Sequence, residues 1–512
     1  MPLLIDGENL SLEDVKSVAC KGIEVRLLDY ARQRIRESRK MVEEYVNRGE
    51  IVYGITTGFG KFSDVVISRD EGRYLQKNLI MSHAAGVGAP LDEEIVRAIM
   101  LLRVNALAKG YSGVREEILD TLLEMTNKRV HPVIPEKGSV GASGDLAPLA
   151  HMVLVMLGEG EAYYKGTRMS GKQAMATAGI KPITLEAKEG VALINGTQVM
   201  TAIGTFALLA GENLAQTADI AAAMTMEALE GILSAFDEKI QRVRPHPGQI
   251  RCAENIRSLL KGSEILGNAD HRRVQDAYTV RCIPQVHGAA RDALAYVRSV
   301  LEREINSATD NPLIFEETGE VISGGNFHGQ PIAIAMDVLG IALSVLGNIA
   351  ERRIERLLNP ALSGLPAFLT KKGGLNSGFM VSQYTAASLV SENKVLSHPA
   401  SVDSIPTSAN QEDHVSMGTI AARKALEISA NVQNILAIEL LCAAQGIDYR
   451  HPSKPGIGTG IAHRIIRQQV PHLTEDRILY RDISKVVGLI EDEVMVTEIK
   501  KIKRGVAFNG DN

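Results

Sequence analysis

Three long segments of the sequence are rich in Ala, Leu, Ile and Met and are apolar on almost every side. They extend from about Thr197 to Leu233, from Pro331 to Leu358 and from Ser416 to Gln445. A helix that is hydrophobic all round must be covered by other helices, as in the centre of a bundle. Strand signals are confined to short hairpins around Tyr163–Met169 and Ile314–Ile322. We therefore predict an all-α protein with a long central helix bundle and minor short β-hairpins.

Helical periodicity also dominates the rest of the sequence. For example, Ile95, Ile99, Leu102 and Ala106 form the apolar stripe of a helix that stops at Gly110. No Pro- or Gly-rich linker marks a clean domain boundary, so we expect one compact protomer with three soft regions. These are an N-terminal region (1–196), a central long-helix region (197–446) and a C-terminal helical region (447–512). Because the apolar helices need neighbours on every side, the sequence favours a homo-oligomer that pools them.

Composition excludes several classes of function. Lys and Arg number 56 against 61 Asp and Glu, and the formal net charge is -5, so a nucleic-acid partner is not expected. The four cysteines are scattered, without the spacing of a zinc knuckle or a disulfide framework, and we expect no metal. Acidic residues interrupt the apolar stretches and the N-terminus lacks a signal pattern, so we expect no membrane partner. These features predict a cytoplasmic protein.

Residues 138–149 read GSVGASGDLAPL, and the tripeptide Ala142-Ser143-Gly144 at their centre can become an electrophile. The Gly144 nitrogen, which no side chain covers, can attack the carbonyl carbon of Ala142 and close a five-membered ring. Loss of one water there and of another from the Ser143 side chain leaves an exocyclic methylidene. Because no ordinary side chain offers such an electron-poor centre, the ring would let the protein act as its own cofactor on amine substrates.

The same residues also suit a plain turn before a helix. Ser143 or Asp145 could cap a helix formed by the apolar run that follows, LAPLAHMVLVML. On that interpretation the protein is a non-catalytic helical scaffold.

Six further motifs follow one another in a fixed order along the chain. Together with the tripeptide they resemble the aromatic amino acid ammonia-lyases over about residues 53–446, and within that family the enzymes that act on histidine. The motifs are YGITTGFG (53–60), SHAAG (82–86), NGTQ (195–198), QDAYTVRC (275–282), GNFH (325–328) and QEDHV (411–415).

The resemblance implies an activity, a cofactor and a quaternary structure. The activity is the deamination of L-histidine to trans-urocanate and ammonia, the first step of histidine degradation. The cofactor is a methylidene-imidazolone that forms by itself from Ala142, Ser143 and Gly144, with no external cofactor. The implied fold is the superhelical arrangement of helices found in fumarase and aspartase. It would assemble as a homotetramer whose active sites draw on more than one subunit.

The resemblance also assigns catalytic roles to Tyr53 and Tyr278. Tyr53 would take the β-proton of the substrate, and because the ordinary pKa of tyrosine is about 10, its surroundings must favour the phenolate by about 4 kcal/mol. Tyr278 and Asn195 would hydrogen-bond the oxygen of the ring or the substrate. From the residues alone, Tyr53 could instead be a core aromatic, and Asn195 could cap the long helix that follows it.

Three residues of the motifs would hold the amino acid end of the substrate and the ring. Arg281 would grip the substrate carboxylate through a two-pronged, charge-assisted pair, with Gln275 in support. Phe327 would stack on the prosthetic ring. The alternatives are an ion pair between Arg281 and a neighbour such as Asp276, and a core position for Phe327.

His83 and Glu412 would determine specificity. Each could hydrogen-bond one nitrogen of an imidazole ring, and a buried carboxylate rejects a phenyl ring that cannot pair with it. Alternatively, His83 is a core histidine and Glu412 is electrostatic decoration before a helix that starts near Ser416. A tyrosine or phenylalanine lyase, or an aminomutase that uses the same electrophile, stays open as a second function. A lyase of the fumarase and aspartase type without an internal electrophile is a weaker alternative.

Overall fold

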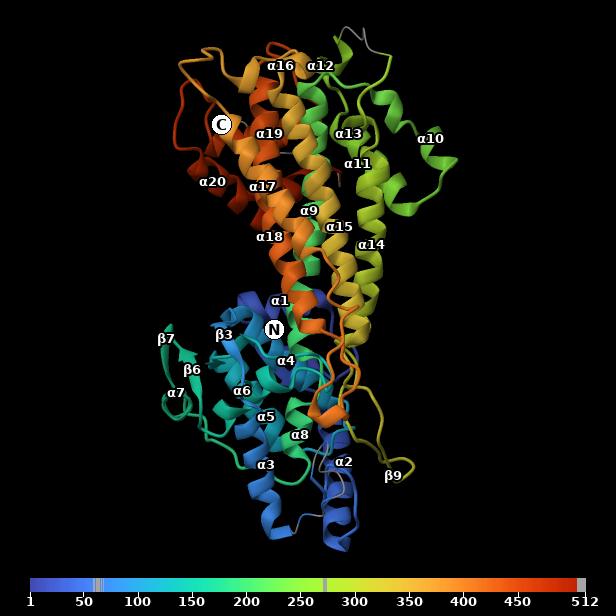
Figure 1. Ribbon diagram of the computed structural model, residues 1–512, viewed down its shortest axis with the longest axis vertical. Coiled ribbons are helices and arrows are strands. Elements are labelled where there is room, and N and C mark those ends of the chain that lie inside the picture. Colours follow the sequence, from blue (N-terminus) through green and yellow to red (C-terminus); the bar gives the residue numbers. More distant parts are fainter. Residues whose placement is uncertain (59, 61–64, 66, 68, 270–273, 504–512) are drawn as a thin grey trace. The chain divides into compact units, whose positions relative to one another are not determined.

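The computed structural model describes the chain except for residues 59, 61–64, 66, 68, 270–273 and 504–512 (Figure 1). Helices account for 62% of it and strands for 7%, which confirms the all-α prediction. The chain divides into two compact units, each assembled from three stretches. Unit 1 comprises 1–206, 298–337 and 399–423, and unit 2 comprises 207–297, 338–398 and 424–512. The three consecutive regions expected from the sequence stay a prediction.

The predicted long apolar helices are present. They are α9 (Gln198–Ala228), α15 (Gln330–Leu358) and α18 (Gly418–Asp448), and a fourth long helix, α14 (Ile283–Glu304), joins them. Within unit 2 they lie side by side: Gly211 of α9 faces leucines of α14 and α15, and Gly347 of α15 faces α18 (Figure 1). At both glycines a β-carbon would lie within 3.2 Å of these side chains, so small residues let the helices approach closely.

Two of these helices, α15 and α18, are long and apolar enough to cross a membrane by length and composition alone. In each, however, 67% of the most apolar window is buried inside the protein. This burial is typical of core helices, as the prediction of a central bundle required.

Unit 1 is organised around α4 (Glu93–Ala108), which is buried on every side from Ile95 to Ala108. The sequence predicted one buried face for this helix, whereas the structure buries all of its faces. The other helices of unit 1 are α1 (Leu12–Lys21), α2 (Asp29–Arg48), α3 (Arg69–His83), α5 (Glu116–Lys128), α6 (Leu146–Met156), α7 (Gly171–Thr177) and α8 (Glu189–Ile194).

The strands of unit 1 are short. β1 (Leu3–Ile5) pairs in parallel with β2 (Val25–Leu27), and β3 (Val87–Pro90) pairs antiparallel with β5 (Pro135–Lys137). The two predicted hairpins are confirmed. They are β6–β7 (Glu161–Tyr164 and Thr167–Ser170), which β4 (His131–Pro132) extends, and β8–β9 (Leu313–Phe315 and Glu320–Ile322).

Unit 2 completes its bundle with shorter helices around the long ones. These are α10 (Glu238–Arg242), α11 (Pro247–Leu259), α12 (Glu264–Gly267), α13 (Tyr278–Arg281), α16 (Pro360–Ser363), α17 (Met380–Leu396), α19 (Ile457–Gln469), α20 (Leu479–Glu491) and α21 (Val494–Lys503).

Candidate active site

Three helices of unit 1, α3, α6 and α8, pack against one another and carry the predicted site residues at their ends. α3 ends at His83, α6 begins two residues after Gly144, and Asn195 ends α8. Because helix ends leave unpaired backbone groups and release the chain into loops, these ends can present side chains to a cavity. Asn195 therefore ends one helix and does not cap the long helix after it.

The backbone around the tripeptide is packed so tightly that glycine is required. Gly144 has φ +73°, and a β-carbon there would lie 2.2 Å from the carbonyl oxygen of Gly196. The Asp145 amide donates to the same oxygen at 2.7 Å, so the backbone segments at Gly144–Asp145 and at Gly196 are in contact. Gly141 is constrained in the same way, because its β-carbon would lie 2.2 Å from Oγ of Ser416. This packing leaves the Gly144 nitrogen without a covering side chain of its own residue.

Asp145 has a function that the sequence did not reveal. It stands at the N-cap position of α6, but its carboxylate makes no cap bond there, so the predicted capping of that helix is wrong. The fully buried carboxylate instead accepts from the Val199 and Met200 amides at 3.0 and 2.9 Å, which caps α9. It also accepts from the hydroxyls of Ser139 and Thr419. Burial raises the pKa of Asp145, and these hydrogen bonds oppose the rise.

Ser143 and Asn195 lie in contact beside the tripeptide. The Asn195 side-chain amide donates to the Ser143 carbonyl oxygen at 3.4 Å. Asn195 is 6% exposed, and its Oδ1 has no hydrogen-bond partner within the described part of the chain. Since a buried acceptor without a donor is costly, this oxygen is suited to receive an N–H group of a bound molecule.

Glu412 lies against the tripeptide, and not in the helix after it. Its Oε1 accepts from the Ser143 hydroxyl at 2.5 Å, and its Oε2 accepts from Thr407 at 2.7 Å. α18 begins only at Gly418. The contact with Ser143 places a carboxylate directly beside the tripeptide.

Two cavities of unit 1 border the tripeptide, and Ala142, Ser143 and Glu412 line both. The first, of about 320 Å³, also receives His83, and the second, of about 400 Å³, also receives Tyr53. Further side chains that line the second cavity are Asn195, Asn311, Phe327, His328 and His414. The structure thus brings together six of the predicted site positions besides Ala142 and Gly144: Tyr53, His83, Ser143, Asn195, Phe327 and Glu412.

His83 is arranged as a hydrogen-bond acceptor. The Ser82 hydroxyl donates to the Leu79 carbonyl oxygen at 3.0 Å and lies 3.1 Å from Nδ1 of His83. A hydroxyl whose hydrogen is used in this way can only accept from Nδ1–H, which leaves Nε2 free to accept from a ligand. Burial lowers the pKa of His83, so its neutral form is favoured. The Gly86 amide, three residues on, donates to Nε2 of His151 at 3.1 Å and holds this segment against α6.

Tyr53 is half-buried in its cavity. Its phenolic oxygen accepts a hydrogen bond from the backbone amide of Gly60 at 3.3 Å. An amide that points at the phenolic oxygen stabilises negative charge there, which is what a tyrosine base requires.

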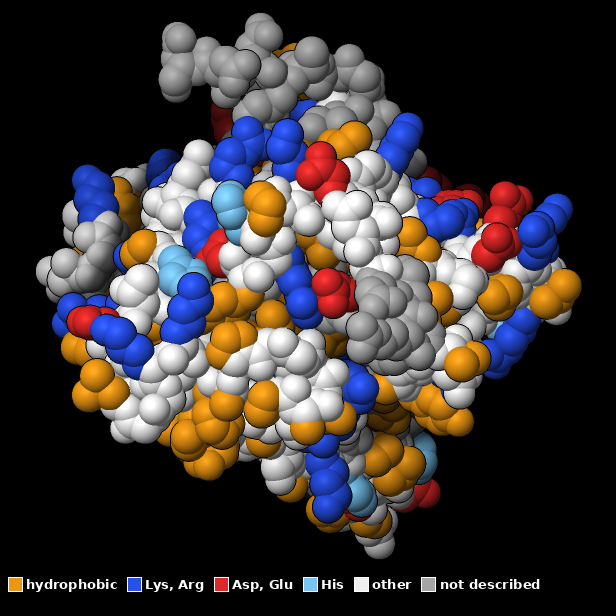
Figure 2. Space-filling view, turned by 90° about the horizontal axis from the view of Figure 1, so that it is seen from above, with side chains coloured by type: hydrophobic (Ala, Val, Ile, Leu, Met, Phe, Trp, Pro, Cys, Tyr) orange, Lys and Arg blue, Asp and Glu red, His pale blue; other side chains and the backbone are white. Residues whose placement is uncertain are grey.

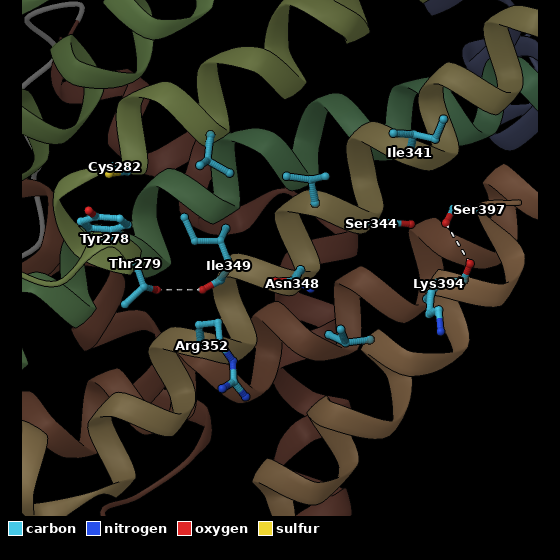
Figure 3. Close-up of a pocket in the computed structure, with 13 residues that line it drawn as sticks. Tyr278, Thr279, Cys282, Ile341, Ser344, Asn348, Ile349, Arg352, Lys394 and Ser397 are labelled. Carbon is cyan, nitrogen blue, oxygen red and sulfur yellow. Dashed lines mark hydrogen bonds between the residues drawn. The ribbon is translucent and has the colours of Figure 1, made fainter.

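The other three predicted residues, Gln275, Tyr278 and Arg281, belong to unit 2 and line neither cavity of unit 1. Tyr278 is 72% exposed, and the Arg281 guanidinium lies 4.5 Å from the centre of its ring. Tyr278 borders a groove of about 560 Å³ between α13, α14, α15 and α17, lined mostly by apolar side chains (Figure 3). Asp276 accepts from the Ile232 amide at 2.6 Å, which fixes the loop before Tyr278.

One group of potential metal ligands lies in unit 2. The ligand atoms of Asp219, Cys252 and His287 lie within 4.8 Å of one another, and all three residues are buried. Asp219 accepts from His287 at 2.9 Å, from Cys252 at 3.2 Å and from Arg291. Burial raises the pKa of the Cys252 thiol, so it stays protonated. Hydrogen bonds therefore account for this cluster.

Comparison with known proteins gives a consistent result. The sequence profile of the family described as "Aromatic amino acid lyase" matches residues 10–468. The histidine ammonia-lyase of Alkaliphilus oremlandii is 62% identical, over 98% of each chain. That of Caldanaerobacter subterraneus subsp. tengcongensis is 64% identical, over 95% of this chain and 96% of the relative.

Solved structures show the same fold. The crystal structure of histidine ammonia-lyase from Trypanosoma cruzi matches with a TM-score of 0.92 at 45% identity, and covers 98% of this chain and 95% of its own. Tyrosine aminomutase from Streptomyces globisporus matches with a TM-score of 0.93 at 40% identity, over 98% of this chain and 99% of its own.

Proposed function

We propose a reaction for this chain from one premise: the chain belongs to the aromatic amino acid lyase family. The proposed reaction is the deamination of L-histidine to trans-urocanate and ammonia. The observation that carries it is the position of Ala142-Ser143-Gly144 between a cavity with His83 and a cavity with Tyr53, with Glu412 bordering both. The names of relatives at 62% and 64% identity support the same substrate.

The residues of the tripeptide fit the methylidene-imidazolone that the family implies. Gly144 adopts a positive φ at a position too tightly packed for a β-carbon, and the Ser143 carbonyl oxygen accepts from the side-chain amide of Asn195. When formed, the ring supplies an electron-poor carbon that draws electrons from a substrate amine. No external cofactor is proposed.

The proposed roles of the cavity residues follow from the hydrogen-bonding groups that they present, among them Oε1 of Glu412, which loses its Ser143 partner when the ring forms. Nε2 of His83 accepts from one nitrogen of the substrate imidazole, and Glu412 pairs with the other. Oδ1 of Asn195 accepts from the substrate amine. Tyr53 takes the β-proton, and the Gly60 amide stabilises its phenolate. Phe327 packs against the ring and keeps water from it.

We assign the substrate carboxylate to residues of a second subunit. Gln275, Tyr278 and Arg281 belong to unit 2, where the groove beside Tyr278 is open and apolar. Two of the apolar side chains that line it, Ile341 and Val345 of α15, are 46% and 43% exposed. Figure 2 shows another view of the surface, on which hydrophobic side chains are exposed among charged ones.

The exposed apolar surface supports a homotetramer in which a second copy of the chain covers this groove. The unit 1 cavities of that second copy would then lie next to Tyr278 of the first. Because the four cysteines are free, as is usual in a reducing compartment, we also propose a cytoplasmic enzyme.

The experiment that tests the reaction supplies histidine, tyrosine and phenylalanine separately and identifies each product. We expect trans-urocanate from histidine as the main product. The alternative is an aminomutase, which the likeness to tyrosine aminomutase keeps open. Release of a β-amino acid, or faster turnover of tyrosine, would select that alternative.

A further inference from the structure

Arg103 is a fully buried cation that none of the proposed roles explains. Its guanidinium donates to Oε1 of Gln198 at 2.7 Å, to the carbonyl oxygens of Asn195 and Thr309 at 3.2 Å each, and to that of Ala192. Within the described part of the chain, no carboxylate lies within ion-pair distance of it. Burial lowers the pKa of Arg103 to about 10, so the group is still charged at neutral pH.

The acceptors of Arg103 explain how a charge is tolerated at this position. Ala192 and Asn195 lie at the C-terminal end of α8, where unpaired carbonyl groups carry partial negative charge. A buried charge that depends on such fixed dipoles holds them in place in return, because moving them would leave it unpaired. Arg103 therefore fixes the turn that carries Asn195.

The guanidinium, Gly196 and Gly144 form three layers in contact. A β-carbon on Gly196 would lie 2.3 Å from Nη1 of Arg103, and one on Gly144 would lie 2.2 Å from the Gly196 carbonyl oxygen. Because both residues are glycines, only the backbone of Gly196 separates the guanidinium from the tripeptide. A side chain at either position would separate the layers.

Arg103 also joins this turn to a second one. Gln198 donates to the Thr309 hydroxyl at 2.7 Å, and the buried pair Lys188–Asp310 at 2.7 Å holds the start of α8 to the same turn. Asn311, the next residue, lines the second cavity. The guanidinium bonds both turns directly, through the carbonyl oxygens of Asn195 and Thr309.

We propose that Arg103 is a positioning residue of the electrophilic centre, which acts through Asn195 and Gly196 on the Ser143 carbonyl and the Gly144 nitrogen. The proposal rests on the self-formed ring proposed above. Arg103 sets the donor that faces the Ser143 carbonyl oxygen, where negative charge develops when a nucleophile adds to the methylidene. A lysine carries the same charge but lacks the planar fork that reaches several acceptors at once.

The test measures the ring without a substrate. Borohydride delivers hydride to the methylidene carbon and water supplies a proton, so each ring gains two hydrogens, or about 2 Da. Intact mass first gives the share of chains that have lost two waters, and the rate of the 2 Da gain then gives the reactivity of the ring. The variants are Arg103→Lys, Gln198→Met and, as the matched control, Arg353→Lys. Arg353 is also fully buried, but it pairs with Glu439 in unit 2.

We expect Arg103→Lys to slow hydride capture by about ten-fold, or to lower the share of ring-bearing chains to a similar extent, because a misplaced donor loses most of its effect. Arg353→Lys should stay within about two-fold of the wild type even if it melts earlier. If Arg103→Lys does not fold, Gln198→Met, which leaves the guanidinium but removes one of its acceptors together with the Gln198–Thr309 hydrogen bond, should slow capture by about three-fold.

A folded Arg103→Lys variant with a complete ring and wild-type capture would overturn the role of Arg103 alone. So would a Gln198→Met variant at the wild-type rate. A wild-type protein that keeps both waters would overturn the self-formed ring itself, and the proposal with it.

Discussion

The Ser143 hydroxyl donates a hydrogen bond to Oε1 of Glu412 over 2.5 Å, although 269 positions separate the two residues in the chain. Thr407 holds the second carboxylate oxygen at 2.7 Å, which fixes the orientation of the group. The hydroxyl that leaves as water when the methylidene forms thus lies directly against the carboxylate that we expect to bind the substrate ring. The residue that we expect to form the electrophile is therefore in direct contact with the residue that we expect to recognise the substrate.

Replacement of Glu412 by Gln keeps the shape of the side chain and removes its charge. We expect Glu412→Gln to lower kcat/KM for histidine by about 10²-fold, because a charged hydrogen bond to the imidazole is lost. The loss of two waters from the tripeptide should be unchanged. Steady-state kinetics and intact mass measure the two effects. Asp403→Asn, in an exposed loop, is the control, and wild-type kcat/KM in Glu412→Gln would rule out the recognition role.

The proposed sharing of active sites between subunits predicts complementation between two inactive variants. Ser143→Ala cannot form the electrophile, and Tyr278→Phe removes a hydroxyl that we assign to the neighbouring subunit's site. Mixed tetramers made by co-expression should contain sites with both intact residues and regain on the order of a tenth of wild-type activity. Activity of the mixture no higher than that of the separate variants would indicate that each chain builds its site alone.

The long helices could be predicted because a helix that is apolar on every face must be covered, and the acidic residues within these segments favour cover by other helices over a membrane. α14 was not singled out, because its polar positions resemble those of a surface helix. Arg103 and Asp145 were missed for a different reason. Their hydrogen-bond partners include Ala192–Gln198 and Val199–Met200, so only the tertiary structure reveals these contacts beside the tripeptide.

The grouping of the site was also only partly predictable. The motifs name the residues, but they do not say which compact unit holds each one. Tyr53, His83 and Glu412 border the cavities of unit 1, whereas Tyr278 and Arg281 belong to unit 2. The periodicity of the sequence does not show which compact unit a motif belongs to, because distant segments of the chain build each unit.

His151 should affect substrate binding although it lines neither cavity. Its Nε2 accepts a hydrogen bond from the Gly86 amide at 3.1 Å, and this bond holds the segment that follows His83. His151→Leu leaves that amide unpaired, and we expect KM for histidine to rise by about five-fold with a smaller change in kcat. His151→Gln, which can still accept, should restore KM. Equal kinetics for the Leu and Gln variants would contradict this role.

Asp448 gives unit 2 a pH-dependent stability. Burial alone would raise the pKa of Asp448, but hydrogen bonds from His463 and His472 and the charge of Arg467 hold it well below its ordinary value. The carboxylate therefore contributes stability above the unfolded pKa of about 4, and this contribution is lost as the pH falls through the lower folded pKa.

Asp448→Asn tests this contribution. We expect the variant to be less stable than the wild type by about 2 kcal/mol at pH 7, and the difference in melting temperature to shrink toward pH 3. Thermal melting at both pH values measures it. A difference that stays constant between them would show that the charge of Asp448 is not responsible.

The central claim is that Ala142, Ser143 and Gly144 condense into the electrophile. The most direct measurement is the mass of the purified, active protein, followed by the mass of the peptide that contains the tripeptide. We predict a loss of two waters, about 36 Da, confined to that peptide and absent from Ser143→Ala. An unmodified linear mass in fully active protein would contradict the account.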